Sequence, residues 1–364
     1  MIFSADDHLY MARALQLAER GLFTATPNPR VGCVIVRDGR IVGEGWHERA
    51  GQPHAEVHAL RNAGALTRGA TVYVTLEPCN HHGRTPPCAN ALVDAGVGRV
   101  VAAMHDPNPQ VTGRGIELLT LAGIRTEVGL METQSTALNV GFVSRMTRAR
   151  PWVRLKTASS LDGKTALANG VSQWITGPAA RADVQRLRAR ACAVLTGIGT
   201  VLIDDPQMTV RDFDIGRQPL RIVVDSRLRT PPRAKILQDD GAWIVCSQAD
   251  RIRCDALLEA GALVLEQPGS DGRVDLAALL TELGSRGINE VHVEAGAKLS
   301  GALLAAGLVD EWIAYLAPKV MGDPARGLLA LPEYAAMAQC HDFQIQDVRQ
   351  LGDDLRITLR PAES

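Results

Sequence analysis

The first stretch of the chain has the spacing of an amphipathic helix. Its apolar residues recur at steps of three or four, which places them on one helical face: Met11, Leu15, Ala18 and Leu22. Ser4 and Asp7 have the spacing of a capping box, and Gly21 marks the end of the pattern. We therefore predict a helix over residues 4–20.

From residue 31 the pattern changes to short apolar runs. Residues 31–36 are apolar throughout, and Asp38-Gly39 before Ile41 is typical of the tip of a β-hairpin. Strands are then expected at residues 71–76, 100–104 and 124–128, and helices at residues 55–66, 89–94 and 116–121. This alternation predicts a mixed sheet with helices on both faces, and active sites in such sheets gather at the carboxyl ends of the strands.

A second α/β series begins at residue 152. Helices are expected at residues 178–191, with Pro178 in the first turn, at residues 276–283 and at residues 299–306. Strands are expected at residues 152–158, 193–196, 220–225, 243–246, 263–265, 290–294, 311–317, 343–348 and 355–359.

Residues 144–151 separate the two series. They are polar and basic and end at Pro151, which favours a solvated linker over a nucleic-acid patch. A chain of 364 residues is also long for a single core. We therefore predict two α/β domains, residues 1–146 and residues 151–364.

Composition indicates neither nucleic acid nor a membrane as a partner. A net charge of −1 provides no basic field for nucleic acid, and no apolar run reaches the roughly 18 residues that span a membrane. The N-terminus lacks a signal-peptide pattern. The seven cysteines form no disulfide framework, and Cys33, Cys192 and Cys246 lie in apolar runs typical of a core. We expect a cytoplasmic protein with reduced thiols.

Residues 54–88 carry the clearest chemical pattern. His54 and Glu56 are followed by Cys79, and Cys88 comes after eight further residues. One histidine and two cysteines suit Zn²⁺, and three protein ligands leave the fourth tetrahedral position for a water, as in catalytic sites. Zinc lowers the pKa of such a water to near neutral, and Glu56 is the expected general acid and base.

The spacing also places these residues. Two residues rotate a helix by about 200°, so His54 and Glu56 meet one metal only if His54 lies in the opening turn. Cys79 follows a predicted strand, and Cys88 is expected to open the next helix.

Other readings of this stretch remain open. His54 and His58 are four residues apart, as in a metalloprotease, but Ala55 stands where that motif has glutamate. His81 and His82 lie between the cysteines; either could be a fourth ligand of a structural zinc, or a loop residue near the substrate. Either cysteine alone would more often be a small core residue.

Two glycine-rich strand exits lie in the second series. Gly197 and Gly199 follow one predicted strand, and Gly296 and Gly301 follow another just before a helix. Exposed backbone N–H groups at such points bind phosphates, although an ordinary tight turn has the same composition. The exit at Gly296 is the stronger of the two, because a helix follows it directly, and a dinucleotide pyrophosphate could bind there.

The first series resembles the cytidine-deaminase superfamily in its His54-Ala55-Glu56 and Pro78-Cys79…Cys88 segments. Deaminases of nucleic acids have two residues between the cysteines, and this chain has eight. The spacer at residues 83–88 instead resembles the bifunctional deaminase/reductase of bacterial riboflavin biosynthesis. Residues 26–32 resemble that family's substrate pocket, which implies that Asn28 contacts the substrate.

The second series resembles the same family's reductase domain, which has a dihydrofolate-reductase-like fold. The matching segments are residues 156–164, 197–200, 204–206, 209–211 and 294–296. The resemblance implies that NADP contacts Ala158, Trp174, Thr200, Asp204, Ser226, Gly296, Ala297, Lys298, Leu299, Ser300, Gly301 and Ala302. It implies that the substrate contacts Ser172, Arg188, Met208, Arg211 and Glu294.

The resemblance implies two reactions on one phosphorylated pyrimidine. Zinc-dependent deamination of 2,5-diamino-6-(5-phosphoribosylamino)pyrimidin-4(3H)-one would be followed by NADPH-dependent reduction of its ribosyl group to ribityl. A nucleic-acid base deaminase with an accessory binding domain is the alternative, and a scaffold with a structural zinc is another. The preference for NADPH over NADH, the order of the reactions and a homo-oligomeric assembly stay open.

Overall fold

The computed structural model describes residues 3–80, 87–109, 111–211 and 213–362. The chain divides into two compact units, Met1–Ala149 and Arg150–Ser364. Each is described by itself below.

The described residues of the first unit form one five-stranded sheet in the order β2-β1-β3-β4-β5. Strand β1 is antiparallel to β2 and β3, whereas β3, β4 and β5 are parallel. The strands are β1 (Gly32–Arg37), β2 (Arg40–Trp46), β3 (Thr71–Val74), β4 (Arg99–Ala102) and β5 (Arg125–Val128). Asp38 and Gly39 at the hairpin tip both have positive φ, as the predicted turn requires.

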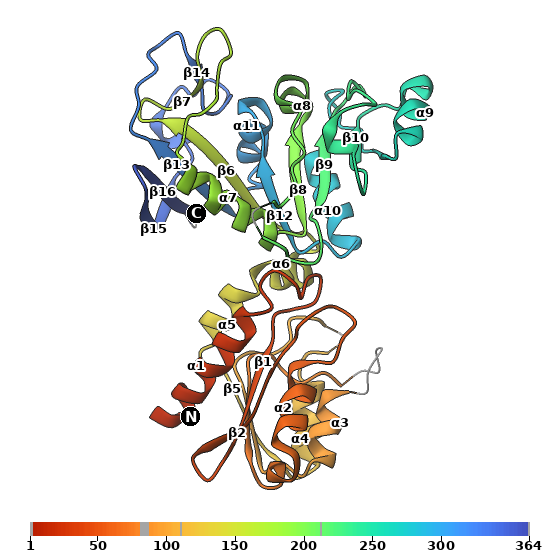
Figure 1. The fold of residues 1–364 in the computed structure, drawn as a ribbon, viewed down its shortest axis with the longest axis vertical. Coiled ribbons are helices and arrows are strands. Elements are labelled where there is room, and N and C mark those ends of the chain that lie inside the picture. Colours follow the sequence, from red (N-terminus) through yellow and green to blue (C-terminus); the bar gives the residue numbers. More distant parts are fainter. Residues whose placement is uncertain (1–2, 81–86, 110, 212, 363–364) are drawn as a thin grey trace. The chain divides into compact units, whose positions relative to one another are not determined.

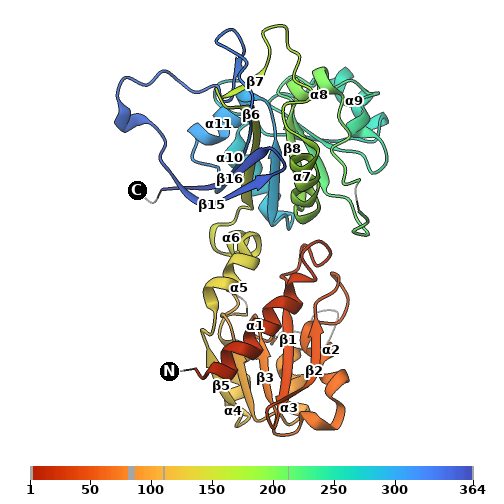
Figure 2. The ribbon, with the colours of Figure 1, turned by 60° about the vertical axis from the view of Figure 1, so that its left-hand side comes forward.

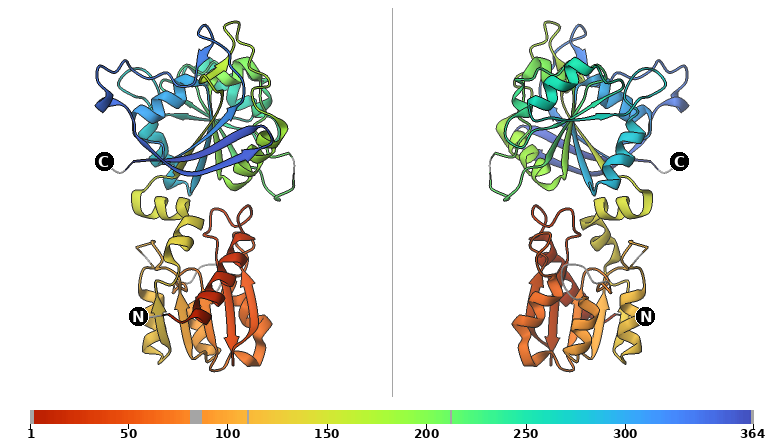
Figure 3. Two further views of the ribbon diagram at one scale, coloured as in Figure 1. Left: turned by 90° about the vertical axis from the view of Figure 1, so that its left-hand side faces the viewer. Right: turned by 90° about the vertical axis from the view of Figure 1, so that its right-hand side faces the viewer.

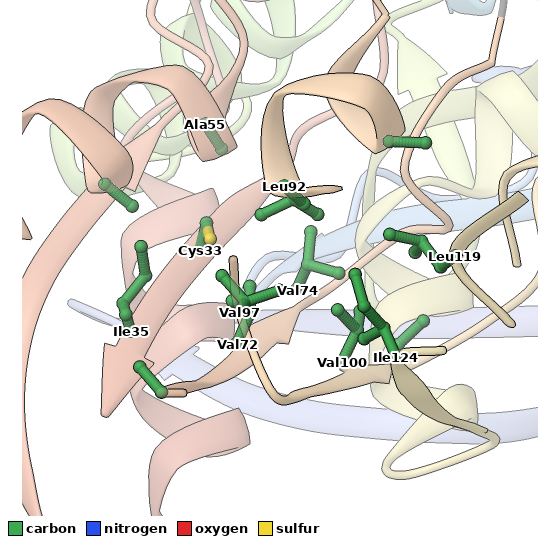
Figure 4. Close-up of a cluster of buried hydrophobic side chains, with 14 of the residues drawn as sticks. Cys33, Ile35, Ala55, Val72, Val74, Leu92, Val97, Val100, Leu119 and Ile124 are labelled. Carbon is green, nitrogen blue, oxygen red and sulfur yellow. The ribbon is translucent and has the colours of Figure 1, made fainter. Parts of the chain in front are cut away.

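Helices cover both faces of this sheet (Figures 1 and 2). On one face, Cys33, Val72 and Val100 pack against α2 and α3 (Figure 4), and on the other, Val34 and Tyr73 pack against α1. The helices are α1 (Ala5–Glu19), α2 (Ala55–Ala63), the 3₁₀ helix η1 (Gly64–Thr67), α3 (Cys88–Asp94), α4 (Arg114–Leu121), α5 (Glu132–Leu138) and α6 (Val140–Arg148). The predicted capping box of Ser4 and Asp7 is confirmed at the start of α1.

In the second unit, nine strands of the described residues form a sheet in the order β11-β10-β9-β8-β12-β6-β13-β16-β15. The strands from β11 to β13 run parallel, and β16 and β15 close the edge as an antiparallel pair. The strands are β6 (Trp152–Ser160), β8 (Ala193–Gly197), β9 (Leu220–Val224), β10 (Trp243–Cys246), β11 (Leu263–Glu266), β12 (Glu290–Glu294), β13 (Glu311–Ala317), β15 (Phe343–Leu351) and β16 (Asp354–Pro361). Short strands β7 (Lys164–Ala166) and β14 (Arg326–Gly327) pair separately.

Helices lie on both faces of this sheet as well (Figure 3). Helices α10 and α11 pack on one face, with a core that includes Leu155 and Val293. Helices α8 and α9 pack on alternate residues such as Val194 and Val223, which point to the opposite face. The helices are α7 (Pro178–Arg190), α8 (Ile198–Asp204), η2 (Lys235–Leu237), α9 (Arg251–Glu259), α10 (Leu276–Ser285), α11 (Ala297–Ala305) and η3 (Met337–Gln339).

The predicted linker at residues 144–151 is wrong as far as Arg148, because α6 continues through it. Phe142 and Ser144 are buried, so the helix has an inward face that the basic residues conceal in the sequence. Arg145 and Arg148 occupy its last turn, where positive charges interact favourably with the negative end of the helix dipole. Helices α5, α8 and α9 were not predicted.

The predicted core positions of Cys33, Cys192 and Cys246 are confirmed, because all three are buried. None of the seven cysteines, which all lie among the described residues, forms a disulfide. No helix within the described ranges is long and apolar enough to cross a membrane.

Candidate active sites

Three side chains from separate elements converge in the first unit. His54 is the N-cap residue of α2, Cys79 lies beyond the carboxyl end of β3, and Cys88 is the first residue of α3. Their ligand atoms all lie within 4.8 Å of one another. The Nδ1 atom of His54 is 3.2 Å from the Cys88 Sγ and 3.6 Å from the Cys79 Sγ.

Glycines in β2 allow α2 to approach closely enough to build this cluster. A Cβ atom on Gly45 would lie 2.3 Å from the carbonyl oxygen of Ala55, and one on Gly43 would lie 2.2 Å from that of Ala59. Only glycine therefore permits this contact between strand and helix. The start of α2, with His54 and Glu56, is held against the sheet as a result.

The electrostatics of the cluster favour a thiolate beside a general acid and base. The Cys88 thiol and the His54 ring lower the pKa of Cys79 to about 4, and contact with Cys79 raises the pKa of His54. Glu56 is 3% exposed, and burial raises its pKa to about 6. One histidine, two cysteines and a buried carboxylate are a donor set that fits zinc with one open position.

The second unit holds a cleft of about 1130 Å³. It crosses the carboxyl ends of β9, β8, β12 and β6, where α/β folds place their ligands. The cleft brings together most of the residues expected in the reductase site: Ala158, Ser172, Trp174, Arg188, Thr200, Asp204, Met208, Arg211, Glu294, Gly296, Ala297, Lys298 and Leu299.

Four of the expected cofactor contacts do not line the cleft. Ser226 lies beyond the end of β9, and Ser300 is fully buried, with its hydroxyl donating to the Ala295 carbonyl over 3.2 Å. A Cβ on Gly301 would lie 2.2 Å from the Ala330 carbonyl oxygen, so this glycine serves close packing. Ala302 follows on the same helix.

An ion pair forms part of the cleft. Arg188 on α7 donates to both carboxylate oxygens of Glu294, from Nε over 2.5 Å and from Nη2 over 2.9 Å. Burial alone would raise the pKa of Glu294, but Arg188 and the ring of His292 hold it well below its usual range. The Arg188 Nη1 also donates to the Thr209 carbonyl. The pair is thus a fixed polar feature beside Gly296.

Comparisons with known proteins match both units. The family model of the RibD C-terminal domain covers residues 151–357, and that of the cytidine and deoxycytidylate deaminase zinc-binding region covers residues 4–104. The chain is 52% identical over 366 residues to riboflavin biosynthesis protein RibD of Escherichia coli, covering 97% of this chain and 99% of the relative. The Haemophilus influenzae RibD is 47% identical over 377 residues, covering 99% and 98%. The chain belongs to the RibD family.

Solved structures of the family agree. Acinetobacter baumannii RibD, form 1, matches with a TM-score of 0.92 at 48% identity, covering 98% of this chain and 99% of that one. A diaminohydroxyphosphoribosylaminopyrimidine deaminase/5-amino-6-(5-phosphoribosylamino)uracil reductase from Thermotoga maritima matches with a TM-score of 0.86 at 33% identity and the same coverage. The expected cytidine-deaminase-like and dihydrofolate-reductase-like folds are confirmed.

Membership of the RibD family establishes the activity expected from the resemblance. The chain is a bifunctional deaminase and reductase of riboflavin biosynthesis, acts on a small molecule and uses zinc and NADPH. The residues that perform each step are taken up below. His81 and His82 lie outside the described residues.

Some residues of this RibD-family site were not found from the sequence. His47 is buried; its Nε2 is 3.0 Å from the Asn28 amide nitrogen and its Nδ1 is 3.2 Å from the Pro53 carbonyl oxygen. Its ring also contacts that of His54 edge to face, with centroids 5.3 Å apart. If Nδ1 carries the proton, Nε2 accepts a hydrogen bond from the Asn28 side-chain NH₂ group. The Asn28 side-chain oxygen can then accept a hydrogen bond from a ligand. No local motif signals a contact between such distant residues.

The cleft also contains cations without an assigned role. Lys156 lies on β6, and burial lowers its pKa. Arg229 and Lys235 line the cleft beyond β9, each with more than half of its side chain exposed. In the sequence these residues are indistinguishable from ordinary surface cations, because only the fold turns them toward the cleft.

Proposed function

We propose that the first unit removes a ring amine from 2,5-diamino-6-(5-phosphoribosylamino)pyrimidin-4(3H)-one and that the second unit reduces the ribosyl group of the product. The observation that carries the proposal is the cluster of His54, Cys79 and Cys88 beside the buried Glu56. The Thermotoga maritima relative is named for the same pair of reactions, which supports this choice of substrate.

Deamination needs a proton to move from water to the departing nitrogen. Zinc held by His54, Cys79 and Cys88 would supply the Lewis acidity that lets water attack near neutral pH. Glu56 takes the proton of the attacking water and delivers it to the amine, which leaves as ammonia. A pKa of about 6 suits both directions of transfer, because the carboxylate and the carboxylic acid are both accessible near pH 7. Asn28 reads the edge of the ring.

Reduction needs the cofactor and the ribose side by side. NADPH bound in the cleft would supply a hydride to the C1′ carbon of the ribose, where the bond to the ring oxygen would break and that oxygen would take a proton. Gly296, Ala297, Lys298 and Leu299 would bind the pyrophosphate. The remaining expected contacts are Ala158, Trp174, Thr200, Asp204, Ser226, Ser300, Gly301 and Ala302 for NADPH and Ser172, Arg188, Met208, Arg211 and Glu294 for the substrate.

The purified protein tests the proposal directly. With the diaminopyrimidine phosphate as substrate, it should release ammonia and then oxidise NADPH. Removal of zinc should stop ammonia release and, with it, the NADPH oxidation that depends on the deaminated product. With the deaminated compound, NADPH oxidation should proceed without ammonia release. Failure to release ammonia from zinc-loaded protein would rule out this substrate.

The assembly and compartment belong to the same proposal. Strand β15 lies at the edge of the second sheet, and Ile345 and Val348 on it are 63% and 53% exposed. An exposed apolar edge of this kind favours pairing with a second copy in a homo-oligomer. Free thiols throughout the described chain suit a reducing compartment such as the cytoplasm.

A further inference from the structure

Glu77 is a buried carboxylate that neither reaction uses. It lies two residues before Cys79, and its side chain is 0% exposed. A buried carboxylate is costly unless it is fully hydrogen-bonded, so its partners indicate what it holds.

The partners of Glu77 lie at the start of α4. Its Oε1 accepts from the backbone N–H groups of Gly115 and Ile116, at 3.0 and 3.4 Å. Its Oε2 accepts from those of Gly113 and Asp106, at 3.0 and 3.2 Å, and lies 3.0 Å from the His105 Nδ1. Gly113, the N-cap residue of α4, has no side chain with which to cap the helix. Glu77 therefore caps α4 from the segment that follows β3, and the dipole of the helix also favours a negative charge at this end.

The backbone beside Glu77 is attached to the same helix. A Cβ on Gly115 would lie 1.9 Å from the carbonyl oxygen of Pro78, so α4 approaches this peptide as closely as a glycine allows. The side-chain Nδ2 of Asn80 donates to the backbone carbonyl of Arg114 over 3.2 Å. The residues on both sides of Cys79 are thus tied to the first turn of α4.

The other side of Cys79 contacts α3. The Cys79 Sγ accepts from the Cys88 N–H over 3.4 Å, and the Cys79 carbonyl accepts from the Ala89 N–H over 3.1 Å. Cys79 therefore lies between two helix starts, and the position of its sulfur relative to His54 depends on both.

We propose that Glu77 is a positioning residue for the zinc ligand Cys79. By capping α4, it holds the segment after β3 so that the Cys79 Sγ lies near the His54 Nδ1 and the Cys88 Sγ, at a spacing that suits a metal. The inference rests on the proposed zinc site and adds to it a supporting carboxylate that does not touch the metal. Such supports set metal affinity through the geometry of the ligand they orient.

Glu77→Gln tests this, because glutamine keeps the shape but turns an NH₂ group toward N–H donors. Zinc affinity, measured by competition with a chromogenic chelator, should fall by about 10- to 100-fold. In cobalt-loaded protein the thiolate-to-cobalt absorption should shift. Reduction of the deaminated substrate with NADPH, measured on the same chain, should be unchanged.

Asp7→Asn is the matched control. Asp7 is also buried, caps a helix and accepts several hydrogen bonds, but it lies at the start of α1, away from the cysteines. It should lower the melting temperature of the first unit and leave zinc affinity and the cobalt spectrum unchanged. Equal loss of zinc in Asp7→Asn and Glu77→Gln would show that affinity merely follows stability and would overturn the proposal.

Gly115→Ala displaces the same loop from the α4 side and should also weaken zinc binding. It decides the question if Glu77→Gln does not fold. The inference would be contradicted if folded Glu77→Gln protein bound zinc as tightly as the wild type. If Glu77→Gln does not fold, wild-type zinc affinity in folded Gly115→Ala protein would contradict it. Absence of zinc from the wild-type site would instead remove the proposed deaminase site itself, and the inference with it.

Discussion

At the scale of single residues, hydrogen-bond partners decide which buried carboxylates do chemistry and which support structure. Glu56 and Glu77 are both buried, and each lies two residues from a proposed zinc ligand. Burial raises the pKa of Glu56, so that it can exchange a proton near pH 7. Glu77 instead accepts hydrogen bonds from a helix start, which is a structural use of the same side chain.

Glu56→Gln should retain zinc and lose deamination. The amide fills the same space but cannot carry a proton, and positioned proton transfer contributes about 10²- to 10⁴-fold to a rate. Ammonia release should fall by about that factor, with metal content per chain unchanged. Near-normal ammonia release by the variant would contradict the role given to Glu56.

Arg229→Met should lower the preference for NADPH over NADH. If the pyrophosphate lies at Gly296 and the nicotinamide beside the Arg188–Glu294 pair, the adenosine end extends toward β9, where Arg229 lines the cleft with its side chain 52% exposed. A hydrogen bond to a charged group contributes about 1.5–3 kcal/mol, so NADPH affinity should fall by roughly 10- to 100-fold while NADH affinity stays constant.

Arg227→Met is the control for that measurement. Arg227 is exposed on the same loop but does not line the cleft. It should leave both affinities unchanged. NADPH differs from NADH by a 2′-phosphate on its adenosine ribose. An equal effect of Arg229→Met on the affinities for NADPH and NADH would show that Arg229 does not bind this phosphate.

Asp7 should make the stability of the first unit depend on acid pH. Burial opposes its charge, but hydrogen bonds from Arg99, Ser4 and Tyr73 hold the pKa of Asp7 well below its usual 3.8. A carboxyl group whose pKa is lower in the folded than in the unfolded state stabilises the fold at pH values above the unfolded pKa. This stabilisation is lost as pH falls from the unfolded pKa through the lower folded pKa. Asp7→Asn should therefore cost about 1.5–3 kcal/mol at pH 7, measured by urea unfolding, and progressively less below about pH 4. A constant difference across that range would contradict the assignment.

Residue spacing predicted which residues converge at the proposed zinc site, but not the residues that support them. His54, Cys79 and Cys88 are recognisable because zinc chemistry restricts both residue type and position relative to helix starts. Glu77 was visible in the sequence only as part of the Glu-Pro-Cys run, since its partners lie at residues 105–116. His47 is similar, because its contact with Asn28 depends on the packing of β2.

At the scale of elements, α11 is the helix whose first turn we propose binds the cofactor pyrophosphate. Gly296 is its N-cap residue, in ordinary extended backbone with φ −74° and ψ 171°. A Cβ there would meet no protein atom within 4 Å, and Gly296 lines the cleft. Neither conformation nor packing of the described chain therefore requires glycine, which leaves the approach of a ligand as the reason for it.

Gly296→Val should weaken NADPH binding with little change in the melting temperature of the second unit. Loss of one hydrogen bond to the charged pyrophosphate is worth about 1.5 kcal/mol, or roughly tenfold in affinity. Gly296→Ala should have an intermediate effect, and zinc-dependent ammonia release should not change. Full NADPH affinity in a folded Gly296→Val protein would exclude this position for the pyrophosphate.

Element prediction succeeded where the apolar period was clear and failed where charge concealed it. Strands β10, β12 and β13 have the predicted bounds, because each is a short segment with buried β-branched or aromatic residues. The last turns of α6 were taken for a linker, since the charges of Arg145 and Arg148 concealed the buried face formed by Phe142 and Ser144. Helix α8 was hidden by Gly197 and Gly199, which suggested only a turn.

At the scale of the whole molecule, two chemistries are built on two separate cores. The apolar clusters around Val72 and Val100 lie entirely within Met1–Ala149, and those around Leu195 and Val223 lie entirely within Arg150–Ser364. The proposed zinc ligands all come from the first unit, and every residue that lines the cleft comes from the second. Each unit is of a size that folds alone.

A chain truncated to residues 150–364 should therefore fold and reduce the deaminated substrate with NADPH. Its sheet is complete within the truncation, and the Arg150–Asp310 ion pair at its first residue is retained, with Nη2 to Oδ1 at 2.8 Å. Calorimetry should give one cooperative transition, and NADPH oxidation should match that of the full chain within a few-fold. A truncated protein that melts cooperatively and binds NADPH but does not turn over would show that the reductase depends on residues of the first unit. A complementary chain of residues 1–149 should bind zinc and release ammonia without any NADPH, which separates the two activities in both directions.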